Sequence, residues 1–398
     1  MTSSEAVPDA SSDPRPRAGP GGAGWRIVDA PHPPSLDAPE AWAYHGIAEV
    51  ERQSAIAELG DADTAARAID LFVAAKNEQH LRRRRVVAVE RSATADGAPE
   101  DAPRVVGHGV AYLWVRSNPH LAFLNLAVLP SHRRRGIGSQ LAERLRQIVV
   151  EEGRTTIIVD VDFAAEPDAT DAAAGKVLIP PTGSGSVAAD KPGVLLAQKH
   201  GLKLELVARR SLLELPLPDG EAERFEAEAR AVAGADYRIH TWEDHVPEAW
   251  LDQYADLETW LTIDEPNADL ELEPDPWDAD RVRAYDAEYA EAGKGYVVTA
   301  AEHVPSGELV AMTMLLYTKD RPEFSEQETT IVLAEHRGHR LGMLVKAVNL
   351  QAHARVRPDT KRIWTWNNEN NPQMLAINVA LGFRPAGGAA SFQGPAAG

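Results

Sequence analysis

Two spacings of apolar residues alternate along the chain, in a similar order in its two halves. Apolar positions three and four apart are typical of amphipathic helices, and they predict helices at 40–59, 62–77, 136–152, 194–200, 281–292, 341–356 and 372–381, with further helical segments between 241 and 260. Runs of β-branched and other apolar residues predict strands at 86–89, 105–115, 121–128, 155–162, 202–215, 237–241, 296–301, 309–318, 329–333 and 363–366. This mixture predicts an α/β fold.

One phrase occurs twice, 204 residues apart, as 128–138 and 332–342. In each copy a β-rich apolar run enters a basic turn that contains glycine, and an amphipathic helix follows. The similarity extends upstream at the same offset, where 105–107 matches 309–311. A period this long indicates two related globular domains, not a solenoid of short repeats.

These features predict a division of the chain into five parts. Residues 1–24 are rich in Pro, Gly and Ser and are expected to form a disordered tail. Two α/β domains then cover 25–216 and 236–386. They are joined by a charged, Ala-rich linker at 217–235, which we expect to be helical, and are followed by a Gly/Ala-rich tail at 387–398. Within the first domain, the polar stretch 164–193 is long for a connection, and two interpretations stay open: a mobile insertion near a site, or disorder.

Composition narrows the class of protein. The chain has 398 residues, of which 44% are hydrophobic, enough for two sizeable cores. No apolar run approaches the roughly 20 residues that span a bilayer, so we expect a soluble, cytoplasmic protein without a membrane partner. The absence of Cys excludes disulfides, thiolate metal sites and Cys nucleophiles, and no His, Asp or Glu spacing indicates a metal site.

The net charge of −19 argues against nucleic acid as a partner, because phosphate backbones need clustered cations. Basic residues cluster only locally. We interpret Arg82 to Arg85 as a solvated entrance to a strand, whereas Arg133 to Arg135 lie within the repeated phrase. Nothing in the sequence indicates an oligomeric state.

The repeated turn has the chemistry of a pyrophosphate site. A helix that begins after a turn presents unpaired backbone N–H groups and the positive end of its dipole, and here Arg side chains lie beside them. His132 and His336 occupy equivalent places, where a phosphate-side or capping contact is favoured over catalysis. The candidate cofactor-binding residues are Val128, Arg133, Arg134, Arg135, Gly136, Ile137 and Gly138 in the first copy, and Val332, Arg337, Gly338, His339, Arg340, Leu341 and Gly342 in the second.

On these residues the chain resembles the GNAT acetyltransferase superfamily in a tandem arrangement. The family motif is Gln/Arg-x-x-Gly-x-Gly/Ala after a strand, which the first copy fits in full. The second copy has Arg340 at the first Gly, which puts the tightness of that turn in question. The resemblance implies acetyl-CoA as co-substrate and two domains, each with a mixed, mostly antiparallel sheet flanked by helices.

A second family motif begins at Asn371 and ends at Gly382 and Phe383. We count Asn371 with the cofactor-binding candidates. Asn378 stands where the family often has a Tyr that protonates the leaving thiolate, and Ala197 stands there in the first domain. Both domains therefore lack the usual acid.

The family's direct mechanism requires a base for the amine proton. Strand alternation places Glu328 and Glu326 on the face of Val332, whereas the equivalent positions before Val128 are Leu124 and Ala122. We therefore assign catalysis to the second domain, with Glu328, Glu326 and Asn378 as catalytic candidates. The alternative for both Glu residues is a solvated strand end.

The acidic loop 264–275 is expected on the acceptor side, where it would attract a small cationic amine; a solubilising loop is the alternative. Trp364 and Trp366 line an acceptor pocket or pack in the core, and core packing is favoured. Three functions stay open: an acetyltransferase for a small amine, a non-catalytic protein that binds or senses acyl-CoA, and an enzyme that acetylates a protein N-terminus or Lys.

Overall fold

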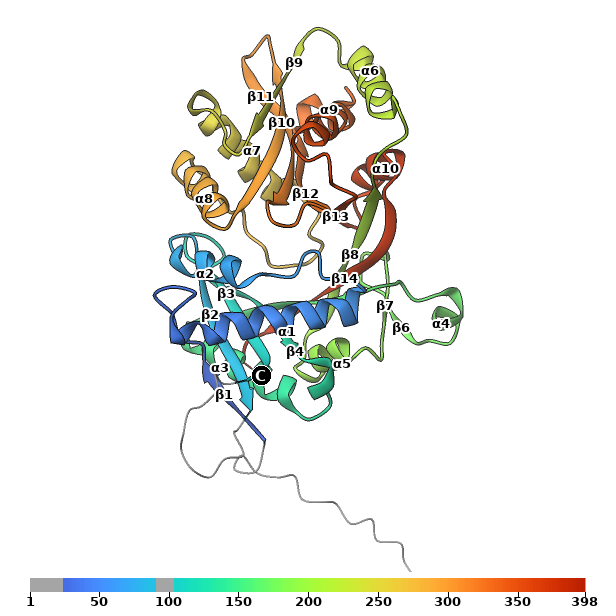
Figure 1. Cartoon of the computed structure of the whole chain (residues 1–398). Coiled ribbons are helices and arrows are strands. Elements are labelled where there is room, and N and C mark those ends of the chain that lie inside the picture. The colour runs from blue at the N-terminus through green and yellow to red at the C-terminus, as the bar shows by residue number, and fades with distance from the viewer. Residues whose placement is uncertain (1–23, 91–103, 398) are drawn as a thin grey trace, which may run out of the picture.

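The computed structural model describes residues 24–90 and 104–397 (Figure 1). The expected N-terminal tail thus lies outside the described residues, except for Gly24. The elements of the first half are β1 (Trp25–Asp29), α1 (Trp42–Leu59), α2 (Ala68–Lys76), β2 (Leu81–Glu90), β3 (Val105–Trp114), β4 (Leu121–Val128), α3 (Ile137–Glu151), β5 (Thr156–Phe163), α4 (Ala169–Ala173), β6 (Val177–Leu178), β7 (Val187–Ala188), α5 (Pro192–Lys199) and β8 (Lys203–Glu214).

The second half repeats this order. After the connecting helix α6 (Glu221–Ala233), its elements are β9 (Tyr237–Glu243), α7 (Leu251–Asp264), α8 (Ala279–Glu291), β10 (Lys294–His303), β11 (Glu308–Thr318), β12 (Phe324–Val332), α9 (Leu341–Val356), β13 (Arg362–Asn368), α10 (Pro372–Ala380) and β14 (Arg384–Pro395). The expected linker 217–235 is therefore mostly a helix, and β12 begins five residues before the strand expected at 329.

A single twelve-stranded sheet runs through both halves, in the order β1-β2-β3-β4-β5-β14-β8-β13-β12-β11-β10-β9. Neighbouring strands of this sheet are antiparallel except for the parallel pairs β4–β5 and β12–β13. Helices cover both faces of the sheet (Figure 1). The expectation of a mixed, mostly antiparallel sheet flanked by helices is confirmed.

The two halves exchange their last strands. β14 lies between β5 and β8, and β8 lies between β14 and β13, so the last strand of each half pairs with the fifth strand of the other. Figure 1 accordingly places the C-terminus among the elements of the first half. The tail expected at 387–398 is wrong, because β14 extends to Pro395.

The sequence pattern did not predict β14, because this strand consists largely of Gly and Ala and has no run of β-branched residues. Gly388 approaches its neighbours so closely that a Cβ there would lie 2.4 Å from the carbonyl oxygen of Ala208. Ala390 and Phe392 are fully buried. The Gly/Ala composition therefore reflects close packing at the centre of the sheet, not a lack of order.

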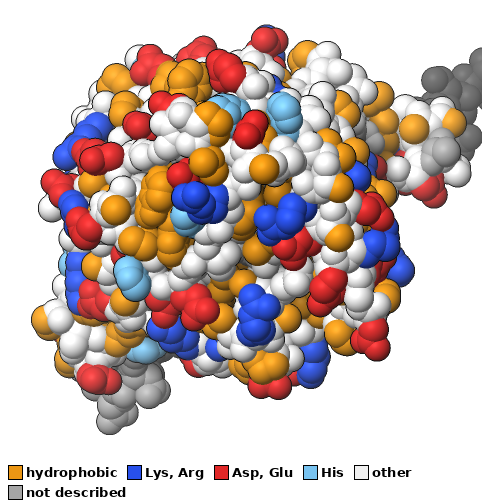
Figure 2. All heavy atoms as spheres, turned by 90° about the horizontal axis from the view of Figure 1, so that it is seen from above, with side chains coloured by type: hydrophobic (Ala, Val, Ile, Leu, Met, Phe, Trp, Pro, Cys, Tyr) orange, Lys and Arg blue, Asp and Glu red, His pale blue; other side chains and the backbone are white. Residues whose placement is uncertain are grey.

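Apolar side chains fill the space between sheet and helices. Leu141 and Leu145 of α3 are completely buried in the core of the first half, and each contributes about 2 kcal/mol through its burial. The second half has one core under α6 and α9 and another under α7 and α8. Seen from the end formed by the second half, acidic and basic side chains are interspersed and form no patch of one sign (Figure 2). Within the described residues no helix is long and apolar enough to cross a membrane.

The stretch 164–193 is ordered and lies near the candidate site. It contains α4 and the β6–β7 hairpin, and its Val187 is fully buried. Arg82 to Arg85 also differ from expectation, since they lie inside β2 and Arg85 is buried. The structure thus agrees with an insertion near a site and not with disorder, and the mobility of this insertion stays a prediction.

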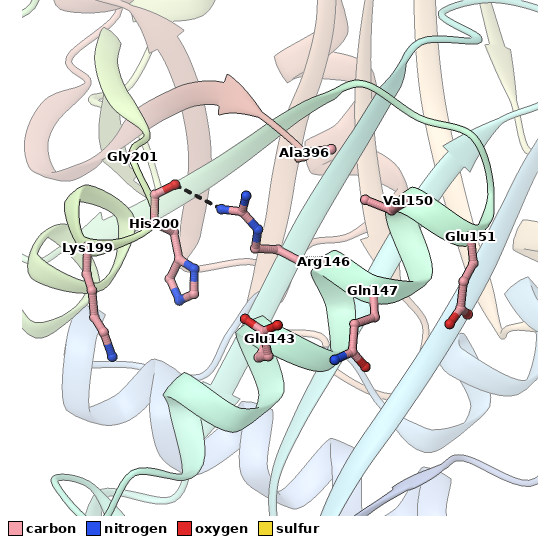
Figure 3. Close-up of a pocket in the computed structure, with 9 residues that line it drawn as sticks. All are labelled: Glu143, Arg146, Gln147, Val150, Glu151, Lys199, His200, Gly201 and Ala396. Atoms are coloured by element: carbon pink, nitrogen blue, oxygen red, sulfur yellow. Dashed lines mark hydrogen bonds between the residues drawn. The ribbon is translucent and has the colours of Figure 1, made fainter. Parts of the chain in front are cut away.

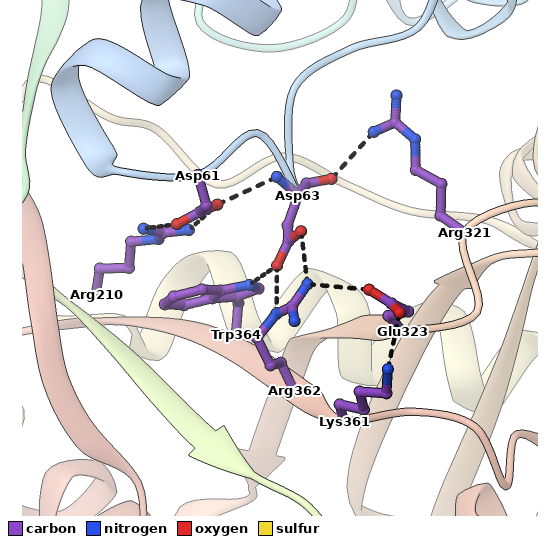
Figure 4. A network of polar contacts seen from close by, with 8 residues as sticks. All are labelled: Asp61, Asp63, Arg210, Arg321, Glu323, Lys361, Arg362 and Trp364. Carbon is purple, nitrogen blue, oxygen red and sulfur yellow. Dashed lines mark hydrogen bonds and ion pairs between the residues drawn. The ribbon is translucent and has the colours of Figure 1, made fainter.

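Loops of each half hold the other half. Asp63, in the loop after α1, accepts bonds of 2.8 and 3.0 Å from Arg362 and one of 2.9 Å from the indole N–H of Trp364 (Figure 4). In return, Glu271, in the loop before α8, accepts a bond of 2.7 Å from Thr156. The bonds of Asp63 reach the start of β13, the fifth strand of the second half, and the bond of Glu271 reaches the start of β5, the fifth strand of the first half. The contacts therefore follow the internal repeat.

Candidate active site

The strand before each repeated turn separates from its parallel neighbour. β4 pairs with β5 only as far as Leu124, and β12 pairs with β13 only as far as Gln327. Beyond these positions the strands diverge and leave backbone groups free for a ligand. In each half, therefore, the residues of the strand that lead into the turn are not paired with the fifth strand, and in the first half this end of the strand borders a cavity.

The two turns have the same backbone conformation with different residues. Arg134 and Gly136 have φ of 64° and 92°, and their equivalents Gly338 and Arg340 have φ of 84° and 55°. Each turn therefore has one glycine and one arginine at its two left-handed positions. Arg340 keeps the tight turn, at a cost of about 1–2 kcal/mol for a residue that carries a Cβ.

The first arginine of each turn ties the turn to its strand and to a helix. The Nε of Arg133 donates to the carbonyl of Val128 at 3.1 Å, and that of Arg337 donates to Val332 at 3.2 Å. Arg133 also pairs with Glu58 of α1, and Arg337 pairs with Asp264 of α7 at 2.9 Å. Both arginines thus shape the turn, while the amides that follow them are left for a ligand.

The other candidate residues of the two turns are either buried or hydrogen-bonded to nearby side chains. Ile137 and Leu341 are buried, so only their backbone faces the turn. His132 lies 2.9 Å from Glu90, and His336 lies 3.0 Å from the hydroxyl of Tyr237. These contacts tie the turns to β2 and β9, and the phosphate-side or capping contact that we expected for the two histidines stays a prediction.

A cavity of about 930 Å³ lies in the first half and joins the turn to the opening in the sheet. Its walls come from α1, β4, β5, α3, α5 and the end of the 164–193 stretch. Candidates in its lining are Val128, Arg133, Arg134, Gly136, Ile137 and Gly138. A Cβ at Gly138 would lie 3.8 Å from Leu196, so the start of α3 leaves room for a chain that passes it.

Carboxylates from β5 and α1 line this cavity. Asp160 and Asp162 of β5 and Glu51 of α1 line it. Burial, then the charges of Asp160 and Glu51, raise the pKa of Asp162 to about 6. Burial also raises the pKa of Asp160, whereas His108, 2.8 Å from Glu51, outweighs burial and lowers the pKa of Glu51.

These residues correct the expectation that the first half has no proton acceptor. That expectation rests on the strand alternation before Val128 and Val332, whereas the acids lie on β5. The signal was present in the alternation Val159-Asp-Val-Asp-Phe163, which places two carboxylates on one face of an otherwise apolar strand. Tertiary structure then brings Glu51 to the same place.

A second groove of about 700 Å³ adjoins the cavity along α3 (Figure 3). The two share Arg146, Lys199 and His200, and Arg146 donates to the carbonyl of His200 at 2.9 Å. The cavity therefore opens onto a surface with two cationic side chains.

The corresponding space in the second half is more closely packed. A Cβ at Gly342 would lie 3.0 Å from Ile377, against 3.8 Å at Gly138. Lys346 occupies the position of Ala142, which lines the cavity of the first half. Its side chain is buried, and burial lowers its pKa to about 7. Side chains thus occupy space that stays open in the first half.

Glu326 and Glu328 lie within β12, but not on the face of Val332. Thr313 pairs with Thr330 and Leu315 with Gln327, so a β-bulge places Glu328 and Thr329 opposite a single residue. The bulge shifts the alternation, which is the physical reason that the expected shared face is wrong. Ile331 packs under α7 and α8, and Val332 packs under α9.

The two glutamates form an acidic group with Glu258 of α7. Glu328 reaches solvent, but the protein around it raises its pKa through desolvation. Burial and the charge of Glu328 raise the pKa of Glu326, and burial raises that of Glu258 to about 7. A proton acceptor is therefore present in the second half as well, next to Lys294.

Asn371 and Asn378 have structural partners. The side chain of Asn371 caps α10 by accepting a hydrogen bond of 3.3 Å from the N–H of Met374. Asn378 is buried and donates to Asn367 at 2.6 Å. The roles in cofactor binding and catalysis that we expected for them stay predictions.

The acidic loop does not form the free rim that we expected. Asp275 accepts a bond of 2.6 Å from Ser117 and pairs with Arg281, and the carbonyl of Glu273 accepts from Asn118 at 3.1 Å. The loop thus binds the first half. Trp364 packs under Arg210, whose guanidinium lies 3.5 Å from its ring centroid, in agreement with core packing.

The comparisons with known proteins agree with this geometry. The family model for the acetyltransferase (GNAT) family matches residues 65–171, which include the first turn and β5. No curated protein matches the chain in sequence. Within the described residues, no group of three or more His, Cys, Asp or Glu side chains is arranged to hold a metal ion.

Solved structures similar in fold cover nearly the whole chain. A tandem GNAT protein from the clavulanic acid biosynthesis pathway has a TM-score of 0.68 at 23% identity, over 94% of this chain and 99% of that one. A GCN5-related N-acetyltransferase from Sphaerobacter thermophilus has a TM-score of 0.55 at 13% identity, over 93% and 96%. At these identities the likeness concerns the fold alone.

Proposed function

We propose that this chain, which the GNAT family model matches at residues 65–171 and whose fold resembles that of a tandem GNAT protein, is a tandem-domain GNAT enzyme that transfers the acetyl group of acetyl-CoA to the amine of a small cationic acceptor. We place the reaction in the cavity of the first half. One observation carries this placement: a single cavity joins the phosphate-type turn to a group of carboxylates.

The residues of the cavity fit acetyl-CoA as a co-substrate. Amides at the start of α3 and the side chain of Arg134 would hold its pyrophosphate, and the opening between β4 and β5 would take the pantetheine arm. Arg146 and Lys199 lie where the cavity meets the outer groove and would face the remaining phosphate. The thioester would then point toward β5.

The carboxylates supply the rest of the chemistry. Asp162, with a pKa of about 6, is ionised at neutral pH and basic enough to take the proton of an attacking amine. Asp160 and Glu51 add negative charge that favours a cationic acceptor. The amine attacks the thioester carbon, the bond to sulfur breaks, and the thiolate leaves as coenzyme A after protonation.

A second candidate site is the group formed by Glu326, Glu328 and Glu258. The bulge in β12 and the raised pKa values of these acids favour it, and our assignment of catalysis to the second half stays a prediction. Ile377 and Lys346 argue against it because they fill the space beside its turn.

Thiol release from acetyl-CoA with a panel of small amines tests the proposal. We expect turnover that falls by about 10²–10⁴ in Asp162→Asn and stays near the wild-type rate in Glu328→Gln. The reverse pattern would move catalysis to the second half. If calorimetry detects binding of acetyl-CoA but no amine is acetylated, the result would support a non-catalytic protein that binds acyl-CoA. If only peptides are acetylated, it would support an enzyme that acts on a protein N-terminus or Lys.

A further inference from the structure

We infer that Ser391, on the exchanged strand β14, is a positioning residue for the carboxylate pair of the first half. The inference rests on the proposed function for its role in catalysis, but the contact on which it depends is geometric. The C-terminal strand would then complete a site whose other residues lie more than 180 residues earlier in the chain.

The contact joins two strands that are neighbours only because the halves exchange them. Ser391 and Asp160 are paired in the antiparallel register of β14 and β5. The hydroxyl of Ser391 donates to Oδ1 of Asp160 at 2.6 Å, and Ser391 is 8% exposed. A short bond to a carboxylate in such a setting belongs to the stronger class of hydrogen bonds.

Close packing fixes the register of this strand. Ala390 and Phe392, on either side of Ser391, are fully buried. At Gly388 a Cβ would lie 2.4 Å from the carbonyl oxygen of Ala208, so the strand cannot shift without a clash. The hydroxyl is therefore held opposite Asp160 by the sheet itself.

The same register gives the two aspartates different surroundings. Asp162 is paired with Ala389, which offers no side-chain donor, whereas Asp160 is paired with Ser391. The other charged groups that act on this pair are Glu51 and Glu58 of α1 and Arg210 of β8. Among these neighbours, the hydroxyl of Ser391 on β14 stabilises the ionised form of Asp160. Asp162 has no such donor and is therefore the carboxyl group that takes up and releases the proton.

A titration of aspartate labelled with ¹³C at its side-chain carboxyl tests this role without any turnover. The resonance of Asp160 is assigned by its absence in Asp160→Asn. In Ser391→Ala we expect its midpoint to move to higher pH, because a lost donor destabilises the carboxylate. In Ser391→Thr, which keeps a hydroxyl, the midpoint should return toward that of the wild type.

Gln393→Ala is the matched control, since Gln393 lies on the same strand but bonds Asp269 and Glu271. It should leave the midpoint unchanged. A midpoint of Asp160 that does not move in Ser391→Ala, in a folded protein, would overturn the inference whatever the activity.

Kinetics separate this failure from that of the proposed function. If the wild type turns over, kcat/KM in Ser391→Ala should fall by about tenfold with unchanged affinity for acetyl-CoA, and Ser391→Thr should restore it. An unchanged kcat/KM would overturn the positioning role in catalysis. No turnover by the wild type with any amine would overturn the proposed function, while the shifted midpoint would still support the contact.

Discussion

At the scale of single residues, the two turns solve one backbone problem in opposite ways. Arg134 and Arg340 are left-handed residues with a Cβ, and each is matched by a glycine in the other copy. The departure at Arg340 therefore leaves the turn intact and only adds strain. Carboxyl groups show the same dependence on place, since the surrounding protein desolvates Asp162 and, with its acidic neighbours, raises its pKa to about 6 although the residue reaches solvent.

Arg340→Gly should stabilise the protein by about 0.5–1 kcal/mol. The substitution releases the cost of a left-handed arginine, and the greater freedom of glycine in the unfolded chain offsets part of that gain. Denaturant unfolding measures the change. Arg355→Gly, at an exposed position of α9, is the control and should destabilise by about 0.5–1 kcal/mol; equal losses in both variants would contradict the prediction.

The acetyltransferase rate should rise with pH through a midpoint near pH 6. Asp162 must be ionised to accept a proton, and with a pKa of about 6 it is protonated below that pH and ionised above it. A profile of kcat/KM against pH checks this limb, which should vanish in Asp162→Asn. A limb that persists in that variant would assign the titration to another group.

Lys346→Met should stabilise the protein by about 1–3 kcal/mol at pH 6. Burial lowers the pKa of Lys346 to about 7 from 10.5. Between these values the unfolded chain binds the proton and the folded chain does not, so the wild-type contribution to stability rises with pH and is least favourable below about pH 7. Unfolding at several pH values measures this slope, and Met should remove it; an unchanged slope would show that Lys346 keeps its charge.

At the scale of elements, β14 and β8 decide how the molecule is built. Each follows a helix of its own half and pairs with the fifth strand of the other. The bulge in β12 also acts at this scale, because its extra residue places Glu328 on the other face of the strand from Val332. Neither feature has a signature in apolar periodicity.

Gly388→Ala should destabilise the protein by about 1–3 kcal/mol, because the added methyl group meets the backbone of Ala208 and the ring of Phe163. Chemical denaturation gives the magnitude. Gly138→Ala, where the nearest atoms lie at 3.8 Å, should be neutral or slightly stabilising in the same assay. A neutral Gly388→Ala would show that β14 tolerates a shift.

At the scale of the whole molecule, the continuous sheet and the reciprocal loops make one body of two similar halves. Asp63 reaches β13 from the first half, and Glu271 reaches β5 from the second. The repeat therefore extends to the contacts between the halves. β5, which lines the cavity of the first half, is thus bordered by β14 of the second half.

Asp63→Ala should lower the stability of the whole chain by about 2 kcal/mol in a single transition. It removes the acceptor for Arg362 and for the indole of Trp364. Scanning calorimetry reports the unfolding of both halves, and a coenzyme that binds one half shows which transition belongs to it. Asp37→Ala, at an exposed position, is the control. Two separate transitions, only one of which shifts, would show that the halves unfold independently.

The sequence by itself determined the local elements, the internal repeat and the turn between Val128 and Gly138, because each depends on residues close together in the chain. Its periodicity also predicted nearly every helix and most strands. Only tertiary structure decided that β14 and β8 are exchanged, that Glu51 joins Asp160 and Asp162, and that Ile377 and Lys346 fill the second turn's surroundings. These depend on contacts between distant segments, where burial and steric fit, not local spacing, select the arrangement.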